Sequence, residues 1–202
     1  MTDITLANSP DRYATLSNFV RQRMVNGTDY GVVPGTNKPT LLKPGAEKLC
    51  RLFGLSSDIT LIYSVEDFTG KDHGEPLFYY RYRCVLTWQQ QMIATCEGSC
   101  NSWEKKYRYR EEKPVCPKCR VRAIRRSDKE FYCWRKLEGC GATFPLSYSE
   151  IASQPVGNVP NPEIFDQINT LQKMAQKRSL VGAVLIATGA SEFFTQDLDD
   201  RV

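Results

Sequence analysis

The chain has 202 residues, of which 41% are hydrophobic and 25% charged, and its formal net charge is +4. These values are ordinary for a globular protein, and no apolar run approaches the ~20 residues needed to cross a bilayer. The start M-T-D-I-T-L-A-N-S-P-D lacks the basic and apolar regions of a signal peptide. We therefore expect one domain with an appendage, no membrane partner, and a protein that stays in the reducing cytoplasm.

Two helices are predicted near the N-terminus. Residues 11–25 have apolar side chains at helical spacing and are followed by the stop signal Asn26-Gly27. A second helix spans residues 44–53, because Pro44 suits a first helical position and Gly54 follows the last apolar residue. The apolar positions of both helices predict that each packs one face on a core.

Three strands are predicted next, because the apolar period changes to two. Residues 59–66 alternate and end in the turn sequence T-G-K-D-H-G-E-P, and residues 77–88 follow with one apolar face. A third run starts at Met92, where Gly98 indicates a bulge or the close approach of another backbone. The short connections predict an antiparallel meander.

A long helix is predicted from Pro162 to Thr188, with Asn161 as its N-cap and Gly189 as its stop. Its apolar residues recur at helical spacing, so one face packs on the sheet. The predicted fold class is α+β: an antiparallel meander packed on a long helix, with a four-cysteine ribbon inserted between them. The core takes residues 1–112 and 146–202, and the ribbon takes residues 113–145.

The inserted segment carries four of the eight cysteines in two pairs. C-P-K-C is a metal-binding knuckle, whereas the second pair is separated by six residues, more than usual. Gly139 and Gly141 supply the tight turn that a late ligand needs. We expect one structural Zn²⁺ per chain, without an open position for catalysis; the alternative is four buried thiols. The ligands would be Cys116, Cys119, Cys133 and Cys140.

Catalysis has little support in the sequence. His73 is the only histidine and lies in a polar turn, so a His-based triad or general base is not expected. Carboxylates flank the same turn, and we interpret them as turn residues and not as the metal ligands of a nuclease. The prediction is that the protein is not an enzyme.

Positive charge is concentrated just before and within the ribbon. From Trp103 to Arg126 there are ten Lys or Arg against three Glu, a local charge of +7, so the other residues sum to −3. Cations interleaved with aromatic rings suit a nucleic-acid strand, since cations bind phosphates and rings stack on bases. The alternative is an edge strand kept soluble by charge. The residues concerned are Lys105, Lys106, Tyr107, Arg108, Tyr109 and Arg110.

A family resemblance rests on three stretches. L-L-K-P-G-A-E-K-L-C-R-L-F-G-L, E-G-S-C-N-S-W-E-K-K-Y-R-Y-R and K-M-A-Q-K-R-S-L-V-G-A-V-L-I-A-T-G resemble the single-strand annealing proteins of the RAD-fifty-two superfamily, including phage and plasmid recombination proteins. The resemblance covers roughly residues 28–110 and 160–200. It implies a bacterial, phage or plasmid origin, and a β-β-β-α core that assembles into rings or arcs. By similarity, the groove for single-stranded DNA would also be lined by Lys43, Lys48, Arg81, Arg83, Lys173, Lys177 and Arg178.

The ribbon departs from the family pattern. The function predicted from the resemblance is ATP-independent binding and annealing of single strands during recombination, together with other recombination or replication proteins. The alternative is a zinc-ribbon adaptor or regulatory subunit that binds a protein or duplex nucleic acid. The cations of the last helix have a simpler interpretation as its solvated face.

Overall fold

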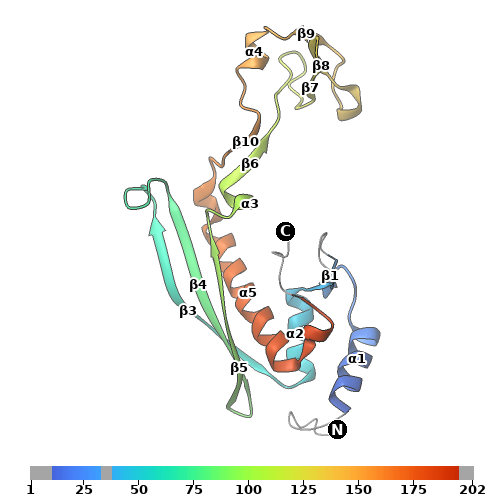
Figure 1. Cartoon of the computed structure of the whole chain (residues 1–202), viewed down its shortest axis with the longest axis vertical. Coiled ribbons are helices and arrows are strands. Elements are labelled where there is room, and N and C mark those ends of the chain that lie inside the picture. Colours follow the sequence, from blue (N-terminus) through green and yellow to red (C-terminus); the bar gives the residue numbers. More distant parts are fainter. Residues whose placement is uncertain (1–10, 33–37, 196–202) are drawn as a thin grey trace. The chain divides into compact units, whose positions relative to one another are not determined.

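The structure is a computed structural model that describes residues 11–32 and 38–195 (Figure 1). The N-terminal residues behind the compartment prediction and the end of the predicted core lie outside these ranges. The chain divides into two compact units, one of Met1–Ser102 with Phe165–Val202 and one of Trp103–Ile164. The predicted insertion, residues 113–145, lies within the second unit, which also includes the segments on either side of it.

The first unit is an antiparallel sheet packed on a long helix. The sheet has the order β3-β4-β5, and α5 packs on β4 and β5 along one face (Figure 1). The α+β class and the meander are therefore as predicted. The elements are α1 (Asp11–Arg23), β1 (Tyr30–Gly31), β2 (Thr40–Leu41), α2 (Lys43–Leu52), β3 (Ser56–Asp67), β4 (Leu77–Trp88), β5 (Gln91–Asn101), α5 (Ile168–Thr188) and the 3-10 turn η3 (Ala190–Glu192).

The core of this unit lies between α2, α5 and the inner face of β4 and β5. Leu49, Leu86 and Val184 are among its fully buried side chains. β3 contributes few side chains to this core, since Asp67 is its only buried residue. β3 also has no partner on its outer side in the described residues, so its edge and much of its surface face solvent.

Two glycines have the roles that the sequence predicts. A Cβ on Gly98 would lie 2.4 Å from the Ser179 nitrogen and 2.7 Å from the Ala175 oxygen, so the α5 backbone crosses β5 at a distance that only glycine permits. Gly189 has φ +70° and ends α5 in the left-handed conformation. Both predictions are confirmed.

The long helix begins later than predicted. Residues Ile164–Gln167 form the 3-10 turn η2, and α5 starts only at Ile168. Asn161 does not cap α5, because its Oδ1 accepts a hydrogen bond from the Glu163 N–H at 3.1 Å. The N-cap prediction is wrong: this asparagine closes a local turn seven residues before the first residue of α5.

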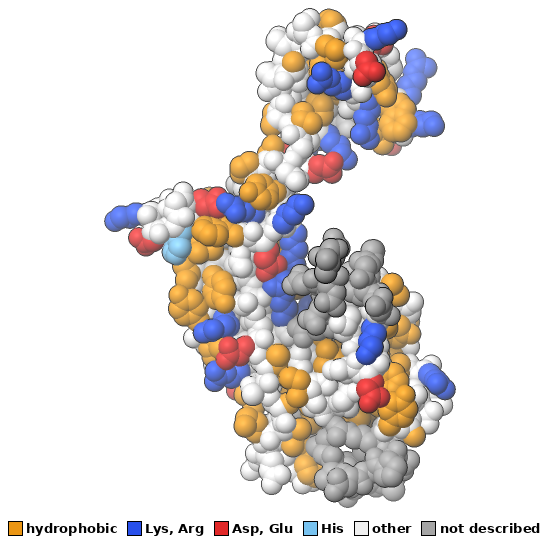
Figure 2. Space-filling view, viewed as in Figure 1, with side chains coloured by type: hydrophobic (Ala, Val, Ile, Leu, Met, Phe, Trp, Pro, Cys, Tyr) orange, Lys and Arg blue, Asp and Glu red, His pale blue; other side chains and the backbone are white. Residues whose placement is uncertain are grey.

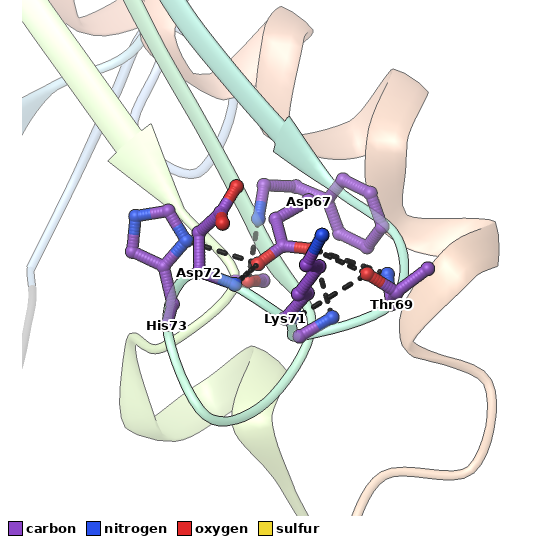
Figure 3. A network of polar contacts seen from close by, with 8 residues as sticks. Asp67, Thr69, Lys71, Asp72 and His73 are labelled. Atoms are coloured by element: carbon purple, nitrogen blue, oxygen red, sulfur yellow. Dashed lines mark hydrogen bonds and ion pairs between the residues drawn. The ribbon is translucent and has the colours of Figure 1, made fainter.

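The β3–β4 turn is organised by one carboxylate. Asp67 Oδ1 accepts hydrogen bonds from the N–H groups of Thr69 and Gly70, while Oδ2 accepts one from the Asp72 N–H and lies 3.1 Å from His73 Nδ1 (Figure 3). These bonds, led by the one with His73, hold the pKa of Asp67 well below its usual value. Asp67 therefore organises the backbone of this turn, in agreement with its interpretation as a turn residue.

A pH-dependent stability follows from Asp67. Because its folded pKa is below the unfolded value of about 3.9, its contribution is present above that pH and is lost as pH falls through the folded pKa. We expect Asp67→Asn to lower the free energy of unfolding at pH 7, and the difference from wild type to shrink below about pH 4. Urea unfolding from pH 7 to pH 3 measures it. A difference that is constant over this range would contradict the assignment.

The second unit combines a two-stranded stem and a small ribbon. β10 pairs antiparallel with β6, and β7, β8 and β9 form a separate three-stranded sheet. The elements are α3 (Lys105–Arg108), β6 (Tyr109–Glu112), β7 (Ile124–Arg126), β8 (Glu130–Cys133), the 3-10 turn η1 (Arg135–Leu137), β9 (Thr143–Pro145), α4 (Ser149–Ala152) and β10 (Gly157–Pro160).

No helix in residues 11–32 and 38–195 is both long and apolar enough to span a bilayer.

Candidate metal centre and nucleic-acid interface

The four predicted cysteine ligands converge on one point. Their sulfur atoms all lie within 4.8 Å of one another, and none is in a disulfide. The Cys116 and Cys140 sulfurs are 3.9 Å apart, and those of Cys119 and Cys133 are 3.6 Å apart. A tetrahedral ion with metal–sulfur bonds of about 2.3 Å requires sulfur–sulfur distances of about 3.8 Å. The arrangement therefore fits a metal ion held by four thiolates.

The first knuckle is formed by backbone hydrogen bonds. The Cys116 N–H donates to the Val121 oxygen and the Arg120 N–H donates to the Cys116 oxygen, each at 2.9 Å. Arg120 has φ +62°, which turns the chain back after the second ligand. The C-P-K-C spacing thus places two sulfurs on one tight turn, as the sequence predicts.

The six residues between Cys133 and Cys140 include the 3-10 turn η1. The chain makes one 3-10 turn over Arg135–Leu137, passes Glu138 at φ +61°, and then returns to the cluster. A Cβ on Gly139 would lie 2.6 Å from the Cys133 sulfur, and Gly141 has φ +79°. The two glycines therefore have the turn-forming role predicted for them, and six intervening residues are compatible with a ligand pair.

Two of the thiols have shifted pKa values. Hydrogen bonding from the backbone N–H of Val121 lowers the pKa of Cys119 to about 6. Burial raises the pKa of Cys133 to about 12. Four close thiols cannot all ionise without a counter-charge, and a divalent cation would supply it.

The ribbon has a small core around these cysteines. Ala123, Ile124 and Ile151 are its buried apolar residues besides the cysteines. The Gln154 side chain joins its two ends: it accepts from the Val115 N–H at 2.6 Å and donates to the Val115 oxygen at 3.0 Å. So few apolar side chains supply little stability without an ion.

The predicted nucleic-acid residues are divided between the two units. Lys105 to Arg110 lie in the second unit, and the other seven lie in the first. Residues 105–108 form the helical turn α3 and not a strand, so cations and rings do not simply alternate on two faces. Tyr107 is buried, at 7% exposure, whereas Tyr109 is half-buried and Trp103 is exposed at 36%. Tyr107 would have to leave its packed position to stack on a base.

Cations and rings are nevertheless adjacent in this segment. The Arg108 guanidinium lies 5.3 Å from the Trp103 ring centroid and 5.4 Å from that of Tyr109. Lys106 lies 4.7 Å from the Tyr107 ring. The Arg110 guanidinium pairs with Glu163 at 2.7 Å. We name Trp103–Arg110 the basic-aromatic segment.

Several cations of the first unit already have partners. Lys48 donates to the buried Asp29 carboxylate at 2.5 Å, and Arg178 donates to the Ser99 oxygen at 2.5 Å. Both contacts tie elements of the first unit together. Lys43 pairs with Glu47 at 3.7 Å on the exposed side of α2, and Lys173 is exposed on α5, where Lys177 is half-buried.

Arg81 and Arg83 share one acidic partner. Both lie on the sheet face opposite α5, and Glu97 contacts them at 3.7 Å and 2.7 Å. A phosphate that bound these arginines would compete with Glu97.

Comparison of the chain with known protein families, curated proteins and solved structures finds no match. The class of the protein rests on its structure alone: it is an α+β protein with a candidate four-cysteine metal centre.

Proposed function

We propose that this chain binds single-stranded nucleic acid, in the first place DNA, and promotes strand annealing in recombination without nucleotide hydrolysis. The observation that carries the proposal is the basic-aromatic segment, where the exposed Lys106 and the half-buried Arg108 lie against aromatic rings. Residues 103–164 contain 13 Lys or Arg and eight Asp or Glu, a net charge of +5, so the other residues of the chain sum to −1. Such a segment can bind phosphates and stack on bases.

Zinc is the ion we propose for the cysteine cluster. Four thiolates in a tetrahedral arrangement are typical of structural zinc sites, and a ribbon this small needs such an ion to fold. The four ligands would then hold the ribbon together without taking part in chemistry.

Self-association is the third part of the proposal. β3 has an open edge within the described residues, and Leu61 and Tyr63 on it are 45% and 51% exposed. An open strand of this length can pair with another chain, which suits the rings or arcs implied by the resemblance.

Binding should depend on salt and on two arginines. If Arg108 and Arg110 contact phosphates, Arg108→Ala and Arg110→Ala should each weaken binding and lower the salt slope by about 0.7. Glu163→Gln should tighten binding, because it frees Arg110 from its ion pair. Fluorescence anisotropy with a labelled oligonucleotide at several salt concentrations measures both effects.

The control for these variants is Lys71→Ala, which removes an exposed cation in the β3–β4 turn. Glu97→Gln extends the test to the first unit, since it frees Arg81 and Arg83. Equal, small effects for Arg108, Arg110 and Lys71 would identify the segment as an ordinary solvated surface. No change with Glu97→Gln would remove Arg81 and Arg83 from the interface.

A further inference from the structure

The outer face of the ribbon sheet carries aromatic rings that its core does not use. The core consists of the cysteines with Ala123, Ile124 and Ile151, and Phe131, Phe144 and Tyr148 pack against it. Tyr132 and Trp134 do not belong to this cluster, although both are half-buried aromatic residues. Packing in this core therefore does not account for either ring.

The two rings lie on one face because of strand alternation. Phe131 and Cys133 on β8 point toward the core, so Tyr132 between them points to the opposite face. Trp134 follows in an extended conformation, with φ −76° and ψ 119°, and continues the alternation onto the same face as Tyr132. The face therefore presents two aromatic side chains, two residues apart.

Cations lie at these rings. Arg125 on β7 is directly opposite Tyr132 in the sheet register, and its guanidinium lies 5.6 Å from the Trp134 ring centroid. The Lys136 ammonium lies 5.9 Å from the same centroid. Both cations are exposed, and within the described residues no acidic side chain pairs with either of them.

The charge around this face is strongly positive. Residues 113–145 contain nine Lys or Arg against three Asp or Glu, a net charge of +6. In Figure 2, blue Lys and Arg side chains lie beside orange hydrophobic ones on the unit drawn at the top. The matching ligand is therefore a polyanion that also offers flat apolar surfaces, which describes an unpaired nucleic-acid strand.

We propose that the ribbon sheet is a second binding platform for single-stranded nucleic acid, formed by Tyr132, Trp134, Arg125 and Lys136. Bases stack on the two rings, and the phosphates beside them contact the two cations. The platform is distinct from the basic-aromatic segment and gives the ribbon a role besides folding. This inference rests on the proposed function, because it assumes that the chain binds single strands.

The platform is tested with aromatic variants of the zinc-loaded full-length protein. Their affinity for labelled oligothymidine is measured by fluorescence anisotropy. Trp134→Ala should weaken binding about 5- to 150-fold, the range that corresponds to the loss of one base–ring stack, and leave the salt slope unchanged. Trp134→Phe keeps a flat ring and should stay within about threefold of wild type. Tyr13→Ala, which removes an exposed ring in the first unit, should have no effect.

Charge variants keep the test independent of any loss of folding in Trp134→Ala. The double variant Arg125→Gln/Lys136→Gln alters exposed side chains only, and zinc content verifies that its ribbon is intact. It should lower the salt slope by about 1.4, as expected for two phosphates on a single strand. Lys71→Gln is the matched control and should leave the slope unchanged.

The outcomes separate the two proposals. If wild-type protein does not bind oligothymidine at low salt, the proposed function fails and the platform fails with it. If wild-type protein binds but Trp134→Ala and the double variant bind equally well, the platform alone is overturned. Binding to duplex that equals binding to single strands, with the same loss in Trp134→Ala, would also overturn it, since paired bases are not free to stack on the ring.

Discussion

Cys116→Ser is expected to release the metal ion and unfold the ribbon. Cys116 is fully buried, and its sulfur is 3.9 Å from that of Cys140. Structural zinc contributes about 10–16 kcal/mol of apparent binding free energy in small metal-dependent domains, far more than this core can replace. Metal analysis should give one zinc per wild-type chain and less than that in the variant, and hydrogen exchange should show residues 113–145 losing protection.

Cys96→Ser is the matched control for this experiment. Cys96 is a half-buried thiol on β5 outside the cluster, so its replacement should leave the metal content unchanged. A Cys116→Ser protein that retains a full complement of metal would refute the four-thiolate site. A wild-type protein that is folded throughout 113–145 without any metal would do the same.

The second large effect is expected at the crossing of α5 over β5. Gly98→Ala would place a Cβ 2.4 Å from the Ser179 nitrogen and 2.8 Å from the Arg178 carbonyl carbon, and these backbone atoms cannot rotate away. The helix must shift off the sheet, which we expect to cost about 3 kcal/mol of unfolding free energy. Chemical denaturation measures the change.

Gly31→Ala provides the comparison for Gly98→Ala. Its Cβ would meet only a Leu42 side-chain carbon at 3.9 Å, an ordinary contact. We expect that variant to stay within about 0.5 kcal/mol of wild type. Similar losses at both glycines would mean that α5 does not pack closely on Gly98.

Features with a local chemical cause could be predicted from the sequence. The cysteine cluster follows from knuckle spacing, Gly189 follows from the helix stop, and the strands β3, β4 and β5 follow from their two-residue period. Gly98 was predictable as a site of close approach. Glycine weakens a strand because it has no side chain to pack, and it is therefore found where another backbone comes close. Its partner, α5, is about 80 residues away in the sequence and could be identified only in the structure.

Features that depend on tertiary contacts were not predicted. The β6–β10 stem pairs segments more than forty residues apart, and neither has a strong strand pattern. The turn at Gln89-Gln90 has φ +47° and +67°, although neither residue is a glycine or asparagine. The helical turn α3 buries Tyr107, although the sequence predicted an accessible ring at this position.

The sequence contained evidence for the proposed ribbon platform, but we interpreted these residues only by the spacing of the cysteines. F-Y-C-W alternates around a ligand, so that Tyr132 and Trp134 must share the face opposite Cys133 once residues 130–133 are identified as a strand. The position of Arg125 opposite Tyr132 requires the strand register, which the sequence alone does not give.

The most direct test of the central claim is an annealing assay with two complementary labelled oligonucleotides. Purified zinc-loaded protein, without nucleotide or added magnesium, should accelerate duplex formation above the spontaneous rate, and high salt should abolish the acceleration because the phosphate contacts are screened. An Arg108→Ala/Arg110→Ala protein should be slower than wild type and Lys71→Ala equal to it. Duplex formation at the spontaneous rate, by a protein shown to be folded and metal-loaded, would contradict the proposed function.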